Sequence, residues 1–414
     1  MNILQVSTTD LVGQRWNGYT LHKNLREMGH KSRTVVMDRS IANDPDNYQL
    51  LSRRRYRALN NFTVYLDNLL GLQNFLAVGS FAIPFKHFYK ELDVIHLQLI
   101  HAQPFFNMFT LPFLSRQSKL VWTIHDPWIT TGHCVYPMDC TKWLTGCHDC
   151  PDLGAPIPIR RDLAAWNWRL KKWMLKNLDV TLVVASEWMR RQITSSPITG
   201  HLPYRVIPFG LDNNVFYLRD RLECRAHLGI PEDAHVLSFR NVFEPRFKGT
   251  DYLTTALSQM ELTKPTYLVT FEAQGLLESI RHKYRLMELG WVHNEHFLAQ
   301  VLAASDLFLM PSLAEAFGVM AVEAMACGTP VVCCEGTALP WVIKAPRGGV
   351  AVPSRDPEAL AAEISRLLVD QDMRRAMGLE AAVLAQTEYS FDLYVRRHVE
   401  LYQDILSGAR NASL

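Results

Sequence analysis

Short β-branched apolar runs alternate with helix-like segments along nearly the whole chain, and this alternation restricts the possible folds more than any other feature of the sequence. Ile3–Val6 has the character of a buried strand, Tyr19–Met28 that of a helix ending at Gly29, and Ser32–Met37 that of a second strand. Similar apolar runs follow at Val94–Leu97, Leu120–Ile124 and Val180–Val184. Apolar strands separated by helices predict an α/β fold with parallel sheets, because such strands are covered on both faces.

A second series of strands and helices begins after residue 204, so we predict two Rossmann-like domains. Pro197, Gly200 and Pro203 interrupt the pattern, and the charge balance changes at the same place. Residues 1–200 carry 23 Lys and Arg against 15 Asp and Glu, whereas the rest of the chain carries 20 against 26. We therefore expect an N-terminal domain at residues 1–204, a C-terminal domain at 205–390, and a last helix near 391–414 packed on the first domain. The strands predicted for the second series are Arg205–Pro208, Val236–Phe239, Leu268–Phe271, Leu307–Met310 and Val331–Cys333.

The composition excludes several other classes of protein. No uninterrupted apolar run reaches the length of about 18 residues that a membrane-spanning helix needs, and no secretory signal precedes the first strand. We therefore expect a cytoplasmic protein. Two basic, aromatic-flanked stretches, Arg53–Arg57 and Arg160–Lys176, suggest peripheral contact with the inner face of the cytoplasmic membrane. The alternative is that these are ordinary helices with their aromatic residues in the core. No nucleic-acid-binding motif accompanies the positive charge, so nucleic acid is not an expected partner.

The segment from Pro311 to Pro330, PSLAEAFGVMAVEAMACGTP, carries the most informative pattern. A strand ends at Met310, and a helix begins near Gly318. The free backbone amides at a helix start bind phosphate, and glycine lets a ligand approach the backbone closely. Glu315 stands before the helix and Glu323 inside it, so each carboxylate can accept hydrogen bonds from a pair of hydroxyl groups. The alternative is that Glu315 is an ordinary first-turn charge and Glu323 lies on a solvated face.

The segment Glu315–Glu323 resembles the E-x7-E motif of the retaining glycosyltransferases of family 4, which have the GT-B fold. The likeness continues through Ile207–Phe216, Lys248-Gly249 and Gly348-Gly349. It implies two Rossmann-like domains that face a central cleft, with residues 1–204 as the acceptor-binding domain and residues 205–390 as the donor-binding domain. It also implies transfer of a sugar, of hexose type, from a nucleotide-sugar donor to a carbohydrate or polyprenol-linked acceptor, with retention of anomeric configuration.

The resemblance also implies roles in donor binding for individual residues. Glu315 would bind hydroxyl groups of the transferred sugar and Glu323 the ribose of the nucleotide. Lys248, together with Arg246, would neutralise the diphosphate, which gains charge as the glycosidic bond breaks. The family's usual arginine position holds Phe243 here, and a usually acidic position holds Trp341. The remaining donor-binding residues are expected to be Gly13, Phe317, Gly318 and Val319.

The first domain has two candidate site segments. Gly13 lies in the loop between the first strand and the first helix, and this loop is not G-x-G-x-x-G, which argues against a dinucleotide-binding dehydrogenase. His125 follows a strand end, where open α/β sheets place site residues, and it resembles the family's active-site histidine. Asp126 either orients His125 or caps a turn. The predicted catalytic residues are His125, Lys248 and Glu315.

Four cysteines, Cys134, Cys140, Cys147 and Cys150, occur within 17 residues as C-x5-C-x6-C-x2-C. This set suggests a structural zinc site, and the alternative is a group of buried or incidental thiols. The same segment resembles bacterial exopolysaccharide enzymes such as the colanic acid glycosyltransferases, which implies polysaccharide or glycoconjugate biosynthesis. The Asp-x-Asp pattern Asp44-Pro-Asp46 lies in a polar loop and not at a strand end, so we expect catalysis to require no cofactor.

Two other functions remain open at the level of sequence. A non-hydrolysing nucleotide-sugar epimerase has the same two-domain architecture and needs no acceptor. A non-catalytic binding protein on a glycosyltransferase scaffold is the second alternative, and the changes at Phe243 and Trp341 leave it open.

Overall fold

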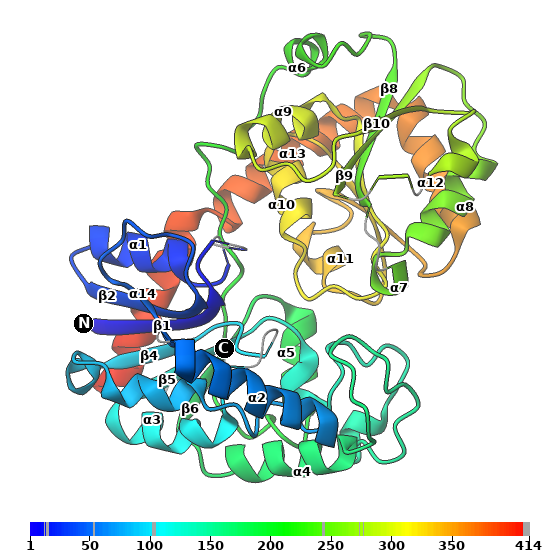
Figure 1. The fold of residues 1–414 in the computed structure, drawn as a ribbon. Coiled ribbons are helices and arrows are strands. Elements are labelled where there is room, and N and C mark those ends of the chain that lie inside the picture. Colours follow the sequence, from blue (N-terminus) through cyan, green and yellow to red (C-terminus); the bar gives the residue numbers. More distant parts are fainter. Residues whose placement is uncertain are drawn as a thin grey trace. The chain divides into compact units, whose positions relative to one another are not determined.

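The computed structural model describes residues 1–11, 13, 16–52, 54–101, 105–241, 245–272, 274–275 and 277–408, without the side chains of 241, 245 and 246. The chain forms two compact units, one made of Met1–Pro208 with Tyr394–Leu414 and the other of Phe209–Leu393 (Figure 1). Each unit is built around one parallel sheet. The predicted α/β class with two Rossmann-like domains is therefore confirmed.

The N-terminal unit contains a seven-stranded sheet in the order β3-β2-β1-β4-β5-β6-β7. Its strands are β1 (Asn2–Thr9), β2 (Lys31–Asp38), β3 (Asn47–Gln49), β4 (Val94–Leu97), β5 (Lys119–Ile124), β6 (Val180–Val184) and β7 (Tyr204–Val206). Its helices are α1 (Tyr19–Glu27), α2 (Arg54–Leu70), α3 (Leu111–Gln117), α4 (Ala164–Leu175), α5 (Glu187–Ser195) and the larger part of α14 (Phe391–Ser407). Helices α1 and α14 lie on one face of the sheet, and α2, α3 and α4 lie on the other (Figure 1).

The strand predicted at Arg205–Pro208 belongs to the first sheet, so its assignment to the second domain was wrong. Strand β7 pairs in parallel with β6, with Leu182 opposite Tyr204. The reason is the right-handed crossover rule: helix α5 connects the two strands, and a β-α-β unit places its second strand beside the first. The short strand β3 was not predicted, because its three residues form no apolar run.

The C-terminal unit contains a six-stranded parallel sheet in the order β10-β9-β8-β11-β12-β13. Its strands are β8 (His235–Asn241), β9 (Thr266–Glu272), β10 (Arg285–Glu288), β11 (Leu307–Met310), β12 (Val331–Cys334) and β13 (Gly349–Val352). Its helices are α6 (Arg221–His227), α7 (Pro245–Lys248), α8 (Thr250–Gln259), α9 (Glu295–Ala304), α10 (Val319–Ala326), α11 (Leu339–Val342), α12 (Pro357–Val369) and α13 (Gln371–Glu388). Apolar residues of β8, β11, α8 and α12 form one buried cluster.

In both sheets the strand order reverses at a central pair of neighbouring strands. These pairs are β1 and β4 in the first sheet and β8 and β11 in the second. Loops that leave the carboxyl ends of such a pair diverge to opposite faces and open a crevice, where ligands of open α/β sheets bind. Within the described part of the chain, no helix is both long and apolar enough to cross a membrane.

Candidate active site

The reversal point of the second sheet brings together two residues predicted to bind the donor. Lys248 follows β8 and Glu315 follows β11, and β8 and β11 are paired neighbours. The Lys248 ammonium group donates a hydrogen bond to Glu315 Oε2 at 2.7 Å. Both side chains are only partly buried, so a ligand can reach the pair. A cation and an anion therefore lie side by side where an α/β sheet binds its ligand.

Backbone contacts between the two loops hold this pair in place. The Phe247 carbonyl accepts hydrogen bonds from Leu313 N at 2.7 Å and from Ala314 N at 3.2 Å. Gly249 has a φ of 67°, and a Cβ atom built there would lie 2.1 Å from the Pro311 carbonyl oxygen. Only glycine allows this approach. The sequence Lys248-Gly249 therefore keeps the lysine beside the loop that carries Glu315.

Helix α10 begins at Gly318, directly after this loop. Gly318 has a φ of 93° and offers no side chain to cap the first amides of the helix. Phe317 is buried, and its ring packs against Phe209 and Tyr389 at centroid distances of 5.2 and 5.8 Å. The Phe317 side chain thus supports the turn, and Val319 is the first helical residue.

Glu323 lies in the interior of α10 and is 0% exposed. The alternative interpretation of Glu323 as a solvated helix-face residue is therefore wrong. A fully buried carboxylate costs free energy unless a hydrogen bond compensates for lost hydration, so it is seldom retained for packing alone. This burial agrees with a role in the site and does not identify the ligand.

Arg246 was predicted to be the cationic partner of Lys248. The side chain of Arg246 lies outside the described residues. Arg240, on β8, forms an ion pair with Glu272 at the end of β9. At position 341, where the family usually has an acidic residue, the Lys344 ammonium group lies 4.5 Å from the centroid of the Trp341 ring.

In the N-terminal unit, the loop after β1 meets the residue after β5. Gly13 has a φ of 69°, and its carbonyl accepts hydrogen bonds from Trp16 N and Asn17 N at 2.9 and 2.8 Å. The Trp16 ring lies 5.2 Å from the ring of His125. The structure therefore brings the predicted residues Gly13 and His125 together through Trp16, which the sequence analysis did not single out.

A buried network of polar side chains contacts His125 through Gln98. The His125 Nε2 atom lies 3.2 Å from Gln98 Oε1, an acceptor, so Nε2 carries the hydrogen. Gln98 Nε2 donates to Gln5 Oε1 at 3.0 Å. His96 binds Thr123 Oγ1 and the hydroxyl group of Tyr402, on α14, both at 2.7 Å. Gln98 thus fixes the orientation of His125, and α14 completes the network.

The protonation state of His125 follows from its surroundings. Burial lowers the pKa of His125 to about 4; the Asp126 carboxylate raises it and the nearby His101 lowers it further. His125 is therefore neutral near pH 7. Asp126 accepts a hydrogen bond from Trp128 N at 3.0 Å, which caps a turn, and it contacts His101 Nε2 at 3.0 Å. Burial raises the pKa of Asp126, but His101 and these hydrogen bonds lower it to below its ordinary value.

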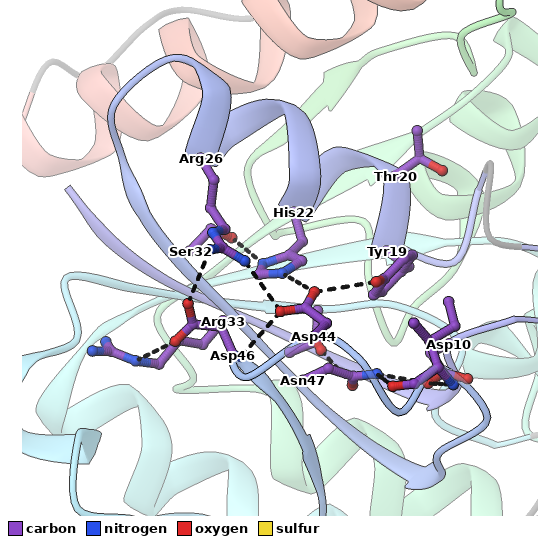
Figure 2. Close-up of polar contacts among 12 residues, drawn as sticks. Asp10, Tyr19, Thr20, His22, Arg26, Ser32, Arg33, Asp44, Asp46 and Asn47 are labelled. Carbon is purple, nitrogen blue, oxygen red and sulfur yellow. Dashed lines mark hydrogen bonds and ion pairs between the residues drawn. The ribbon is translucent and has the colours of Figure 1, made fainter.

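The two carboxylates of the Asp-x-Asp pattern are engaged within the N-terminal unit (Figure 2). Asp44 contacts the Tyr19 hydroxyl group, His22 Nε2 and Arg26, each at 3.1 Å. Asp46 lies 3.5 Å from Arg26 and 3.7 Å from Arg33. Both carboxylates therefore tie the loop after β2 to α1 and β2.

Comparison with known proteins agrees with this arrangement. Residues 18–215 match the model described as Glycosyltransferase Family 4, and residues 234–370 match the model described as Glycosyl transferases group 1. A D-inositol 3-phosphate glycosyltransferase from Corynebacterium jeikeium is 30% identical over 305 residues, which cover 69% of each chain. The chain belongs to the group 1, family 4 glycosyltransferases.

Other relatives of this glycosyltransferase match a shorter part of it. The D-inositol 3-phosphate glycosyltransferase of Segniliparus rotundus is 34% identical over 220 residues, 50% of this chain and 49% of the relative. The chain spans about half the length of the first relatives it matches. Their names do not identify exopolysaccharide or colanic acid enzymes, so that narrower resemblance stays a prediction.

Solved structures confirm the GT-B fold of this glycosyltransferase. Sucrose-phosphate synthase from Thermosynechococcus elongatus has a TM-score of 0.72 at 19% identity and covers 99% of this chain and 100% of its own. The Anabaena protein Alr3699/HepE, solved in complex with UDP and glucose, has a TM-score of 0.68 at 17% identity. It covers 98% of this chain and 100% of its own.

The four clustered cysteines of this glycosyltransferase, Cys134, Cys140, Cys147 and Cys150, line one pocket and are free thiols. Burial raises the pKa of Cys134 to about 11 and that of Cys147 to about 12. Across the described residues, however, no three His, Cys, Asp or Glu side chains are grouped as metal ligands would be. The observed arrangement does not form the tetrahedral ligand set that zinc requires. A structural zinc ion remains a prediction from the cysteine spacing alone.

The sequence analysis missed the residues that support His125. Gln98 and His96 are polar residues at the end of an otherwise apolar strand. This change of polarity is the local feature of the sequence from which they could have been predicted as site residues. Tyr402 gave no such signal, because its partner His96 lies 306 positions away in the sequence.

Proposed function

We propose that this chain transfers a sugar from a nucleoside diphosphate sugar to a carbohydrate or polyprenol-linked acceptor, with retention of anomeric configuration. We propose bacterial polysaccharide or glycoconjugate biosynthesis at the cytoplasmic face of the membrane as its setting. Family membership supports transfer as the reaction class, and the residues of the site support the nucleotide-sugar donor.

The observation that carries the proposal is the Lys248–Glu315 pair before the start of α10. Phosphate groups bind at helix starts, where free amides and the helix dipole favour negative charge. In the proposed complex, Lys248 turns to the donor diphosphate and Glu315 accepts hydrogen bonds from hydroxyl groups of the sugar. The ion pair between Lys248 and Glu315, at 2.7 Å, keeps the lysine charge in the site before the donor binds.

The same residues account for the chemistry of the proposed reaction. As the bond from the anomeric carbon to the diphosphate breaks, negative charge grows on the leaving oxygen. Fixed cations and amide dipoles stabilise this charge without having to reorganise. Lys248 and Arg246 supply the cations in the proposal, and Glu323 binds the ribose. Neutral His125 lies near the reacting sugar in the proposal, and front-side attack by the acceptor requires no protein nucleophile.

The proposal is tested by thermal stabilisation with a panel of UDP-, GDP-, ADP- and dTDP-sugars. UDP-glucose comes first, because the Anabaena structural neighbour was solved with UDP and glucose. A donor present at about 100 times its Kd stabilises the unit that binds it by about 2.7 kcal/mol. We expect one nucleotide class to raise the melting temperature, and Lys248→Ala to abolish most of that rise.

The matched control is Lys264→Ala, which removes an exposed lysine of the same unit and should leave the rise unchanged. Product analysis with the active donor then compares polyprenol-linked carbohydrate acceptors with D-inositol 3-phosphate, the compound that names the relatives. Epimerised donor formed without an acceptor would replace the proposal with the epimerase alternative. No stabilisation by any donor would reject it in favour of a non-catalytic scaffold.

A further inference from the structure

Helix α2 of the N-terminal unit has its polarity reversed relative to an ordinary surface helix. Its two buried residues are polar, Asn60 and Asp67. Its outer side exposes Leu59, Phe62 and Tyr65, with Phe62 58% exposed. An amphipathic helix of a globular domain normally turns its apolar stripe to the core and its polar residues to water.

The buried polar residues of α2 bind a neighbouring segment of the chain. The polar side of the helix therefore belongs in the interior, and the apolar side belongs on the surface. Asn60 Oδ1 accepts hydrogen bonds from the backbone amides of Val78 and Gly79 at 3.1 and 2.9 Å. Asp67 accepts from the backbone amides of Phe75 and Leu76, both at 3.3 Å. The inner face of α2 therefore holds the segment from residue 75 to 79, and the apolar residues on its outer side are left exposed.

Helix α4 repeats this pattern in part: its buried side contains the apolar residues Trp168, Met174 and Leu175, but also two polar residues. Asn167 and Lys171 are fully buried, whereas Trp166 and Trp173 are 57% and 66% exposed. The Lys171 ammonium group donates to the carbonyl oxygen of Trp128 at 2.7 Å and to that of Thr131 at 3.1 Å. These two buried polar residues again bind internal loops, and the rings of Trp166 and Trp173 are exposed.

The two helices belong to one layer of the unit. Asn167 Nδ2 donates to the carbonyl oxygen of Gly71, the residue that follows α2, at 3.0 Å. Both helices lie on the face of the sheet opposite α1 and α14 (Figure 1). Phe113 on α3, in the same layer, is exposed and lines a groove with Phe81, Phe85 and Arg116. The outer side of this layer therefore presents several large aromatic side chains.

Positive charge accompanies these aromatic residues. Arg54 and Arg55 are exposed on α2, and Arg169, Lys172 and Lys176 are exposed on α4 or at its end. Within the described residues of the two helices, the only carboxylate is the buried Asp67. A second copy of this chain would place the same basic patch opposite itself, because symmetric dimers pair identical surfaces. An anionic surface is the complementary occupant.

We propose that the outer side of α2 and α4 docks the protein onto an anionic phospholipid bilayer. Tryptophan and tyrosine favour the interface between headgroups and acyl chains, and lysine and arginine near anionic headgroups each contribute about fivefold in membrane affinity. The chain lies on the bilayer and does not cross it. This inference concerns the N-terminal unit and does not depend on the proposed transfer reaction.

The test is co-sedimentation of the full chain with vesicles of phosphatidylglycerol mixed with phosphatidylcholine, and with vesicles of phosphatidylcholine alone. We expect binding to the anionic vesicles that weakens as salt is raised. The double variant Trp166→Ala/Trp173→Ala should lose about tenfold or more in affinity, since each ring buries a large apolar area. The double variant Arg169→Gln/Lys172→Gln should lose about 25-fold.

The matched control is Trp291→Ala, which removes a tryptophan of the C-terminal unit that is also 57% exposed and should leave vesicle binding unchanged. Circular dichroism verifies that each variant is folded. Vesicle binding equal to wild type in both double variants would overturn the proposal. So would a lipid-free dimer that Trp166→Ala/Trp173→Ala converts to monomer, because this face would then join two copies. Thermal stabilisation by the nucleotide sugars is measured without lipid. Failure of the proposed sugar transfer and failure of the proposed membrane docking are therefore seen in separate experiments.

Discussion

At the scale of single residues, Gly249 shows how one position can set the geometry of the site. Its φ of 67° demands glycine, and so does the Pro311 carbonyl oxygen, which would lie 2.1 Å from a Cβ atom at this position. We expect Gly249→Ala to destabilise the C-terminal unit by about 3 kcal/mol or more, because strain and steric overlap add. Donor-induced stabilisation should fall as well, since Lys248 moves with this turn.

The control for Gly249 is Gly229→Ala. Gly229 has the same φ of 67° but no heavy atom within 4 Å of its Cβ position. Its substitution should cost only the conformational penalty, about 1 kcal/mol. Urea denaturation of both variants measures the difference. Equal losses would contradict the role assigned to the close approach between Gly249 and Pro311.

At the scale of elements, α14 contributes a buried hydrogen bond to the first sheet. The Tyr402 hydroxyl group lies 2.7 Å from His96 Nδ1 and 3.4 Å from Gln5 Nε2. Tyr402→Phe leaves these buried groups without their partner, so we expect a loss of about 1–3 kcal/mol in the free energy of unfolding. Tyr65→Phe, at an exposed position of α2, should change it by less than about 0.5 kcal/mol. Denaturant titration distinguishes these outcomes, and equal values would show that α14 packs without this hydrogen bond.

At the scale of the whole molecule, the two units should differ in their response to acid. Burial lowers the pKa of His125 and of His398 to about 4, and it lowers the pKa of His22 and His96 as well. All four histidines lie in the N-terminal unit. In the C-terminal unit, burial likewise lowers the pKa of His235.

The sign of the effect follows from where protons bind first. As the pH falls below about 6.5, the unfolded chain protonates these histidines before the folded chain does, so stability decreases until the folded pKa is reached. A difference of about 2.5 pKa units corresponds to about 3 kcal/mol for each of His125 and His398. Burial raises the pKa of Asp67 to about 6, so the folded chain binds this proton before the unfolded chain does as the pH falls. This group therefore offsets the loss of stability by about 3 kcal/mol.

We therefore expect the N-terminal unit to lose more stability than the C-terminal unit between pH 6.5 and about 4. Pulse proteolysis with peptide mapping at several pH values identifies which unit opens first. Earlier opening of the C-terminal unit would contradict the larger number of neutral buried histidines in the N-terminal unit.

The sequence by itself determined the local features of this protein. The strands at Ile3–Val6, Leu120–Ile124 and Leu307–Met310 all appear within the observed elements, because the apolar pattern of a buried parallel strand is contained in a few neighbouring residues. The strand-turn-helix setting of Glu315 was predictable for the same reason. Its partner Lys248 was expected in the same site from the resemblance, and the structure shows the two in contact.

Only the tertiary structure decided the features that depend on distant parts of the chain. It pairs β7 with the first sheet, places Asp126 against His101, and brings Tyr402 into the polar network of His125. It also leaves Phe62, Trp166 and Trp173 exposed on α2 and α4. In each case the partner lies outside the local sequence window, or the choice between two helix faces depends on what the rest of the fold covers. Local periodicity cannot specify such contacts, because it reports the spacing of apolar residues and not which surface they meet.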